Sequence, residues 1–156
     1  MGQLDEIDMK ILSALHSDAS VSIPELSKQL GINQSVVYSR ISRMQKRGVI
    51  EKFTVHVNED QLGLKGAMVA GLNVDPKLRE SVLSGLEKLE EVRLVREVTG
   101  RFDAIVDLRG SSLNDLNKTV YGIIGNLPGV MHVEVFTEVS RRIAPFRFRL
   151  VKLPSA

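Results

Sequence analysis

Apolar residues recur at helical spacing through the first 47 residues of the chain, which predicts three helices. The first is expected over residues 4–17, with a buried stripe of Ile7, Ile11, Leu12 and Leu15. Asp5 is suited to cap it, and acidic side chains near a helix N-terminus are favoured by the helix dipole. A second helix is expected after Ser22, which forms an S-x-x-E capping box with Glu25.

Residues 23–47 are interpreted as two short helices joined by a tight turn. Gly31 is placed to end the first of them, and Asn33 is a favoured residue for beginning the next. In the later helix a core stripe is expected from Val37, Ile41 and Met44, whereas the opposite face is small, polar and basic. A helix, a glycine turn and a second helix with such a face is the helix-turn-helix pattern.

That outer face suits DNA, since short serines permit close approach and basic side chains contact phosphates. A solvated helix in any small three-helix domain would be the plain alternative. The candidate DNA-binding residues are Gln34, Ser35, Tyr38, Ser39, Arg40, Ser42, Arg43 and Lys46. Arg40 lies toward the flank of the helix, where it can reach a phosphate or pair with Asp5 or Asp8, and the pattern leaves both open.

Beyond the helices, residues 49–57 alternate with period two and predict a strand. The polar, glycine-containing stretch 58–66 marks a domain boundary. We therefore expect a helix-turn-helix domain over residues 1–50, a hinge strand and linker over 51–66, a second domain over 67–140, and a basic tail over 141–156.

The second domain reads as a strand–helix–strand unit that occurs twice. Strands are expected over 67–74, 92–99, 104–109 and 130–140. One helix follows Asp75-Pro76, and another begins at Ser112 with Asp115 three residues later. The order β-α-β-β-α-β is the ferredoxin-like split unit, so the fold class is α+β. Both helices must cover one sheet face, and the partly apolar other face favours self-association, most simply as a two-fold dimer.

Composition narrows the class of protein. The chain has 156 residues, no cysteine and 43% hydrophobic residues. Packed cores are therefore possible, whereas disulfides, zinc knuckles and thiol nucleophiles are excluded. The acidic N-terminus and the lack of a membrane-length apolar run predict a soluble, cytoplasmic protein with no membrane association. The three histidines are scattered and no metal-ligand or phosphate-loop spacing occurs, so neither an enzyme nor a metal or cofactor is expected.

The net charge of +2 conceals a partition along the chain. Residues 34–57 carry five basic residues and one acidic residue, and the tail 141–156 carries five basic residues and no acidic one. The positive charge thus concentrates on the third helix and the tail, as in nucleic-acid-binding proteins. The tail also alternates around Phe146, Phe148 and Leu150, and we expect an extra edge strand there rather than a DNA contact.

Several spaced motifs then resemble one family. They are L-D-x-x-D-x-x-I-L at residues 4–12, the stretch from Leu30-Gly31 to Val49-Ile50, Leu62-Gly63, Gly100-Arg101-Phe102-Asp103, and Leu127-Pro128-Gly129-Val130. Over residues 4 to 140 the chain is similar to the Lrp/AsnC, or feast/famine, transcriptional regulators. Asn33 stands where that family usually has serine, and Met44-Gln45 where Leu-Glu is common.

The resemblance implies an N-terminal winged helix-turn-helix, a hinge strand and a C-terminal domain that dimerises and stacks into assemblies such as octamers. It further implies an amino-acid effector held between dimers, near the loop 100–103 and the facing strand 131–135. The candidate effector-binding residues are Thr99, Gly100, Arg101, Phe102, Asp103, His132 and Glu134.

Chemistry supports roles for these side chains. Backbone N–H groups of a glycine loop bind carboxylates. Asp103 or Glu134 can accept from an ammonium group, and His132 or Glu134 can select the effector side chain. The alternative is a plain hairpin at Gly100 and a turn-stabilising aspartate at Asp103.

We therefore expect an amino-acid-responsive transcriptional regulator that binds an imperfect palindrome in double-stranded DNA as a dimer or assembly of dimers. One rival is an architectural DNA-binding protein of the same fold that has no effector. The other is a metabolic enzyme with a helical appendix, which the Ser/Arg/Lys face of the third helix disfavours.

Overall fold

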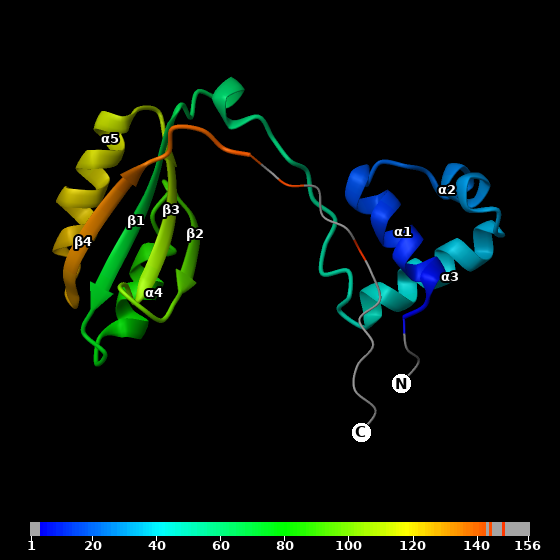
Figure 1. The fold of residues 1–156 in the computed structure, drawn as a ribbon, viewed down its shortest axis with the longest axis horizontal. Coiled ribbons are helices and arrows are strands. Elements are labelled where there is room, and N and C mark those ends of the chain that lie inside the picture. Colours follow the sequence, from blue (N-terminus) through cyan, green and yellow to red (C-terminus); the bar gives the residue numbers. More distant parts are fainter. Residues whose placement is uncertain (1–3, 143, 145–147, 149–156) are drawn as a thin grey trace. The chain divides into compact units, whose positions relative to one another are not determined.

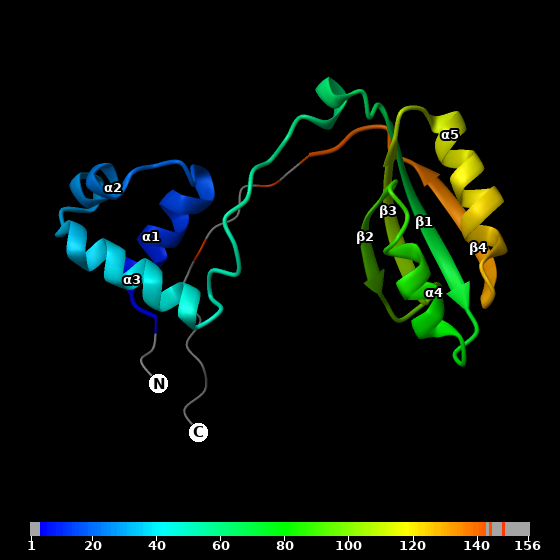
Figure 2. The same ribbon diagram turned by 180° about the vertical axis from the view of Figure 1, so that it is seen from behind.

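The computed structural model describes residues 4–142, 144 and 148 (Figure 1). The chain forms two compact units. One, called the helical unit below, comprises the described residues up to His56 together with Ala144 and Phe148, and the other, the sheet unit, runs from Val57 to Arg142. Figure 2 shows the same ribbon from behind.

Three helices build the helical unit, as the periodicity predicts: α1 (Glu6–Ser17), α2 (Ile23–Leu30) and α3 (Gln34–Lys46). The α1 N-terminus is closed by a reciprocal capping box. The carboxylate of Asp5 accepts from the backbone N–H of Asp8 at 2.9 Å, and that of Asp8 accepts from the backbone N–H of Asp5 at 3.1 Å. The Asp8 side chain is therefore held in place at the start of α1 by this capping box.

The ends of α2 and α3 lie where the sequence signals place them. At the start of each helix, however, one hydrogen bond of the full capping pattern is missing. The Ser22 hydroxyl accepts from the backbone N–H of Glu25, but the Glu25 carboxylate accepts from Gln29 instead of completing the box. Gly31 ends α2 in the left-handed conformation at φ 65°. Asn33 begins α3 without a side-chain hydrogen bond, so its backbone conformation alone fills the capping position.

The helices enclose one small core. Its buried apolar residues are Ile11, Leu12, Leu26, Val37, Ile41 and Met44. Phe148 packs against this cluster from the C-terminal segment, with its ring edge-on to His16 at 5.3 Å between centroids. The strand predicted over the tail falls largely on residues outside those described.

The sheet unit confirms the β-α-β-β-α-β order. Its strands are β1 (Gly66–Val74), β2 (Val92–Glu97), β3 (Ala104–Gly110) and β4 (Val130–Thr137). They form one antiparallel sheet in the order β2-β3-β1-β4. The helices α4 (Arg79–Leu86) and α5 (Leu113–Lys118) pack on one face of it (Figures 1 and 2). Their contacts include Val82, Leu86, Leu116, Val120 and Ile124 against Met68, Ala70, Leu72, Val106 and Leu108.

A group of ion pairs fastens the short 3-10 turn Glu59–Leu62 to the sheet. Arg109 on β3 pairs with Glu59 at 3.1 Å and with Glu138, just past β4, at 2.8 Å. Arg93 on β2 reaches the same Glu59 at 3.3 Å. Arg109 is only 14% exposed, so these contacts fix where the chain enters and leaves the sheet unit.

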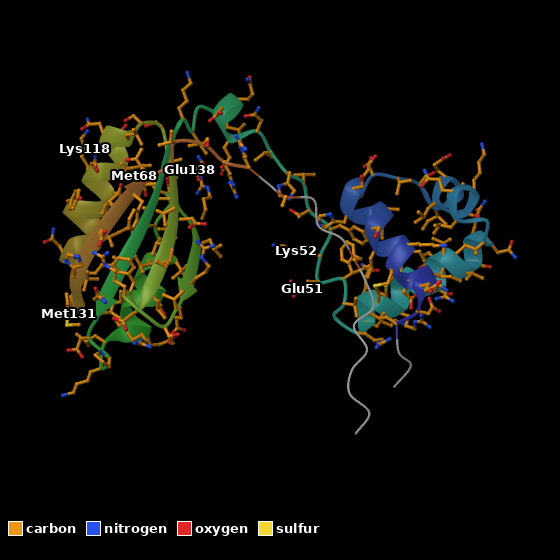
Figure 3. All side chains as sticks on the ribbon, in the orientation of Figure 1. Glu51, Lys52, Met68, Lys118, Met131 and Glu138 are labelled. Atoms are coloured by element: carbon orange, nitrogen blue, oxygen red, sulfur yellow. The ribbon has the colours of Figure 1, made fainter. Side chains whose placement is uncertain are left out.

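The strand predicted over residues 49–57 does not form in this chain. A strand needs a hydrogen-bonded neighbour, and residues 51–58 have none among the described residues. This segment carries Glu51 and Lys52 (Figure 3), and its apolar positions Phe53, Val55 and Val57 are 48%, 80% and 57% exposed. The alternation is real, but its apolar side chains remain exposed among the residues that the structure describes.

Boundaries in the sheet unit differ from the predicted ones for local reasons. The α4 helix begins at Arg79, because Asp75 closes a turn by accepting from the backbone N–H of Lys77. The α5 helix runs into a π turn (Thr119–Ile123) and a 3-10 turn (Ile124–Asn126). The strand predicted over 130–140 is shorter than expected: β4 ends at Thr137, and its pairing with β1 shifts between Asn73 and Val74.

That shift changes which β4 side chains face the core. Val133 and Val135 pack against it, but Met131, which a regular period of two would place on their face, is 65% exposed near the start of β4 (Figure 3). A bulge inserts one unpaired residue, and Met131 has no partner in the β1 register.

Candidate DNA-binding and effector-binding surfaces

The outer face of α3 is the candidate DNA-binding surface. Val37, Ile41 and Met44 are buried, and the predicted contacts lie on the remaining sides. Gln34, Ser35, Tyr38, Ser39, Arg43 and Lys46 are exposed, whereas Arg40 and Ser42 are half-buried. Tyr38 is 68% exposed on this face, so its ring and hydroxyl are accessible to a partner.

Two aspartates of α1 meet two arginines of α3, and we call these four residues the Asp/Arg cluster. One nitrogen of Arg40 donates to both oxygens of Asp5 at 2.8 and 2.7 Å, and to Asp8 at 2.9 Å. Arg43 donates through Nη2 to both oxygens of Asp8 at 3.0 and 2.9 Å. Of the two roles left open for Arg40, this structure shows the pairing with the aspartates.

Burial makes this cluster more than a surface ion pair. The Asp8 side chain is fully buried and that of Arg40 is 18% exposed, whereas that of Arg43 is 47% exposed. The hydrogen bond from Arg40 holds the pKa of the Asp5 carboxyl below its ordinary value, and the same contacts raise the pKa of Arg40. Arg40 therefore serves the α1–α3 contact, and Arg43 lies at its solvent edge.

Two features of this surface escaped the sequence reasoning. The contact between Asp8 and Arg43 was not expected, although Asp5/Asp8 and Arg40/Arg43 share the same i, i+3 spacing on their helices. Arg47, which follows α3, is exposed beside Lys46. Neither Lys46 nor Arg47 has an ion pair among the described residues, so both cations are available to an anionic partner.

The candidate effector site is the β2–β3 loop with its neighbours on β1 and β4. Gly100 adopts φ 135°, which favours glycine. The carbonyl of Arg101 accepts from the Asn73 amide at 2.8 Å, and the Arg101 guanidinium pairs with Glu134 on β4. It also lies 5.3 Å from the centre of the Phe102 ring.

Phe102 packs the β2–β3 loop against the sheet. Its ring covers Gly71 on β1, where a Cβ would lie 2.6 Å from the ring carbons. It also meets Phe136 on β4 edge-on at 6.4 Å between centroids. Gly71 alternates with the core-facing Ala70 and Leu72, so Phe102 lies on the sheet face opposite the helices.

Asp103 is engaged inside the unit. One carboxylate oxygen accepts from the backbone N–H of Val74 at 3.0 Å, and the other from Arg79 at 3.1 Å. The structure thus shows Asp103 joining the loop to β1 and α4, a role that differs from the local turn contact considered from the sequence.

The other predicted residues are more accessible. Glu134 is 28% exposed and pairs with Arg101, whose side chain is 74% exposed. Thr99 and His132 are exposed. An open surface hollow beside the loop is lined by Arg79, Glu97, Val98 and Thr99, and sequence reasoning did not identify Arg79 or Glu97. In the described part of the chain no group of acidic or histidine residues is arranged to hold a metal ion, and no helix there is long and apolar enough to cross a bilayer.

Comparisons with known proteins find a matching family model for each of the two units of the chain. A family model described as winged helix-turn-helix DNA-binding matches residues 4–51, and one described as Lrp/AsnC ligand binding domain matches residues 67–144. The HTH-type transcriptional regulator FL11 of Pyrococcus abyssi is 36% identical over 127 residues, covering 81% of this chain and 83% of that protein.

Two solved structures have the same fold. That of Escherichia coli AsnC is 25% identical with a TM-score of 0.84, and the match covers 97% of this chain and all of that one. A Neisseria meningitidis transcriptional regulator solved in complex with L-methionine is 17% identical with a TM-score of 0.88, covering 94% and 97% of the two chains.

Proposed function

Since this chain belongs to the Lrp/AsnC family of transcriptional regulators, we propose that it senses a small amino acid and binds an imperfectly palindromic operator. The observation that carries the proposal is the outer face of α3. Its small serines, one exposed tyrosine and the exposed cations Lys46 and Arg47 form a surface suited to the major groove of DNA. As a DNA-binding regulator it would act in the cytoplasm and would not be an enzyme.

The Arg101–Glu134 pair supports amino-acid binding. A zwitterion carries a carboxylate and an ammonium group, which complement the arginine and the glutamate respectively. Exposed ion pairs contribute only about 0–1 kcal/mol, so an effector could replace this one at little cost. The L-methionine complex of the structural relative from Neisseria meningitidis is consistent with an amino acid as the effector class.

The open face of the sheet supports assembly. It exposes Leu94 and Phe136, each at 46%, beside the partly exposed Val69 and Ile105. An apolar face of this kind is covered most simply by a second copy, giving a two-fold dimer. Two such α3 helices would read half-sites about 34 Å apart or a multiple of that spacing. Dimers would associate further, with the octamer as the expected assembly.

The proposed regulation follows from linkage. An effector that binds one arrangement of the dimers more tightly than another shifts the population toward it. The coupling is reciprocal: the factor by which the effector changes the affinity for DNA equals the factor by which DNA changes the affinity for the effector.

The test is a gel shift on the DNA upstream of the protein's own gene, at fixed salt, with each of the twenty amino acids in turn. We expect sequence-specific binding that one or a few amino acids alter. Binding indifferent to all twenty would contradict amino-acid sensing and favour an architectural role. Equal affinity for that DNA and for random DNA would contradict an operator at that place.

A further inference from the structure

The basic side chains of α3 fall into two electrostatic classes. Arg40 and Arg43 are matched by Asp5 and Asp8, so the Asp/Arg cluster carries no net formal charge. Lys46 and Arg47 have no carboxylate partner in the described chain. Attraction to the phosphate backbone depends on uncompensated cations. Lys46 and Arg47 therefore supply it, and Arg43 contributes little to it despite its charge.

The position of Arg43 nevertheless suits contact with DNA. Ser39, Arg43 and Lys46 follow one another at i, i+4 and i+7, so they share a stripe along α3. Ser39 is small, and its hydroxyl donates back to the carbonyl of Val36 on its own helix. The Arg43 side chain remains 47% exposed although its tip is anchored.

The anchoring involves one part of the guanidinium. Nη2 donates to both oxygens of the buried Asp8, whereas no hydrogen bond of Nη1 or Nε to a described residue occurs. An arginine has five donors in a rigid planar fork, so bonding one nitrogen to Asp8 restricts the orientations that the whole guanidinium can take. Asp8 is itself fixed by the capping box and by Arg40.

We propose that Arg43 reads a guanine in each half-site of the operator and that Asp8 is the positioning residue that holds its guanidinium for this contact. Guanine presents two acceptors, O6 and N7, in the major groove, and the fork of arginine fits them. A charge already matched by Asp8 adds little sequence-independent attraction, but an oriented fork distinguishes bases. The inference rests on the proposed DNA binding and assigns its specificity to one side chain.

The experiment is selection of bound sites from a random DNA library by the full-length protein at fixed salt, followed by sequencing. The variants are Arg43→Lys, which keeps the charge but loses the fork, and Lys46→Arg as the matched control. We expect the wild type to select a motif with a G·C pair in each half-site. Arg43→Lys should lose that preference by roughly tenfold or more at this position, whereas Lys46→Arg should keep the whole motif.

Asp8→Asn tests the positioning role, with circular dichroism to establish that the variant is folded. It should weaken preference at the Arg43 position and leave the rest of the motif in place, since a general loss of structure would weaken all positions alike. A motif selected unchanged by Arg43→Lys would overturn the assignment and make Arg43 a phosphate contact. A wild type that selects no motif would instead overturn the proposed operator binding, and the assignment with it.

Discussion

The contact between Gly71 and Phe102 makes Gly71→Ala a sharp probe of how the effector loop is seated. The new Cβ would lie 2.6 Å from two carbons of the Phe102 ring, whereas carbon atoms prefer about 3.5–4.0 Å. The ring must therefore move by about 1 Å, and it is held in place by Phe136. Overpacking of this kind costs about 1–3 kcal/mol.

Urea unfolding followed by circular dichroism measures that cost. With a slope of about 1.5 kcal/mol per molar urea, a loss of 2 kcal/mol lowers the midpoint by about 1.3 M. Gly85→Ala is the matched control, because its Cβ would meet Leu127 at an ordinary 3.7 Å. Alanine is the better helix former, so this variant should keep or slightly raise the midpoint.

A double-mutant cycle isolates the contact itself. In a Phe102→Ala background the ring is gone, so adding Gly71→Ala should cost much less than it does in the wild type. Since Phe102 belongs to the candidate effector loop, Gly71→Ala should also weaken effector binding. A wild-type midpoint for Gly71→Ala, or an equal cost with and without the ring, would refute the reasoning.

Three further outcomes are expected. Lys46→Ala should weaken binding to all DNA sequences alike. In a salt titration, the slope of log K against log salt should decrease in magnitude by about 0.9 for each phosphate that is no longer neutralised. An unchanged slope would show that Lys46 does not contact a phosphate. Glu134→Gln should weaken amino-acid binding by calorimetry while Glu87→Gln, on the exposed end of α4, should not; equal effects would remove Glu134 from the site. Hydrogen bonds from Ser112, Ser111 and Lys118 lower the pKa of Asp115 from 3.8 to about 2. Its contribution to stability is therefore present above pH 3.8 and lost as the pH falls toward 2, so Asp115→Asn should flatten the decline of the unfolding free energy over that interval, and parallel profiles would contradict it.

Sequence predicted the elements whose causes are local. Capping and glycine turns fix α1, α2 and α3 within a residue or two. The strands β1 and β3 lie within a residue of their predicted ranges, because their partners lie within the same unit. The segment 49–57 shows the limit. Its pattern matches a strand, but whether a strand forms depends on a neighbouring backbone that no local pattern supplies.

The candidate sites divide in the same way. Helical periodicity places the α3 residues on their faces, so the exposure of Ser39 and Lys46 followed from spacing alone. The engagement of Asp103 with Arg79 and Val74 joins positions 24 and 29 residues apart in the chain. Only tertiary structure brings these together, and the seat of Phe102 on Gly71 escaped for the same reason.

The position of Phe148 in the chain affects how chimeras of such proteins should be designed. It packs against the core of the helical unit, although in the sequence the sheet unit, Val57–Arg142, comes between it and the three helices. The sheet unit is thus an insertion with two covalent junctions. In a chimera made with one crossover near residue 57, α1 would come from one parent protein and the residue at position 148 from the other. A chimera in which only the sheet unit is exchanged, with crossovers at both of its ends, would keep His16 and Phe148 from the same parent.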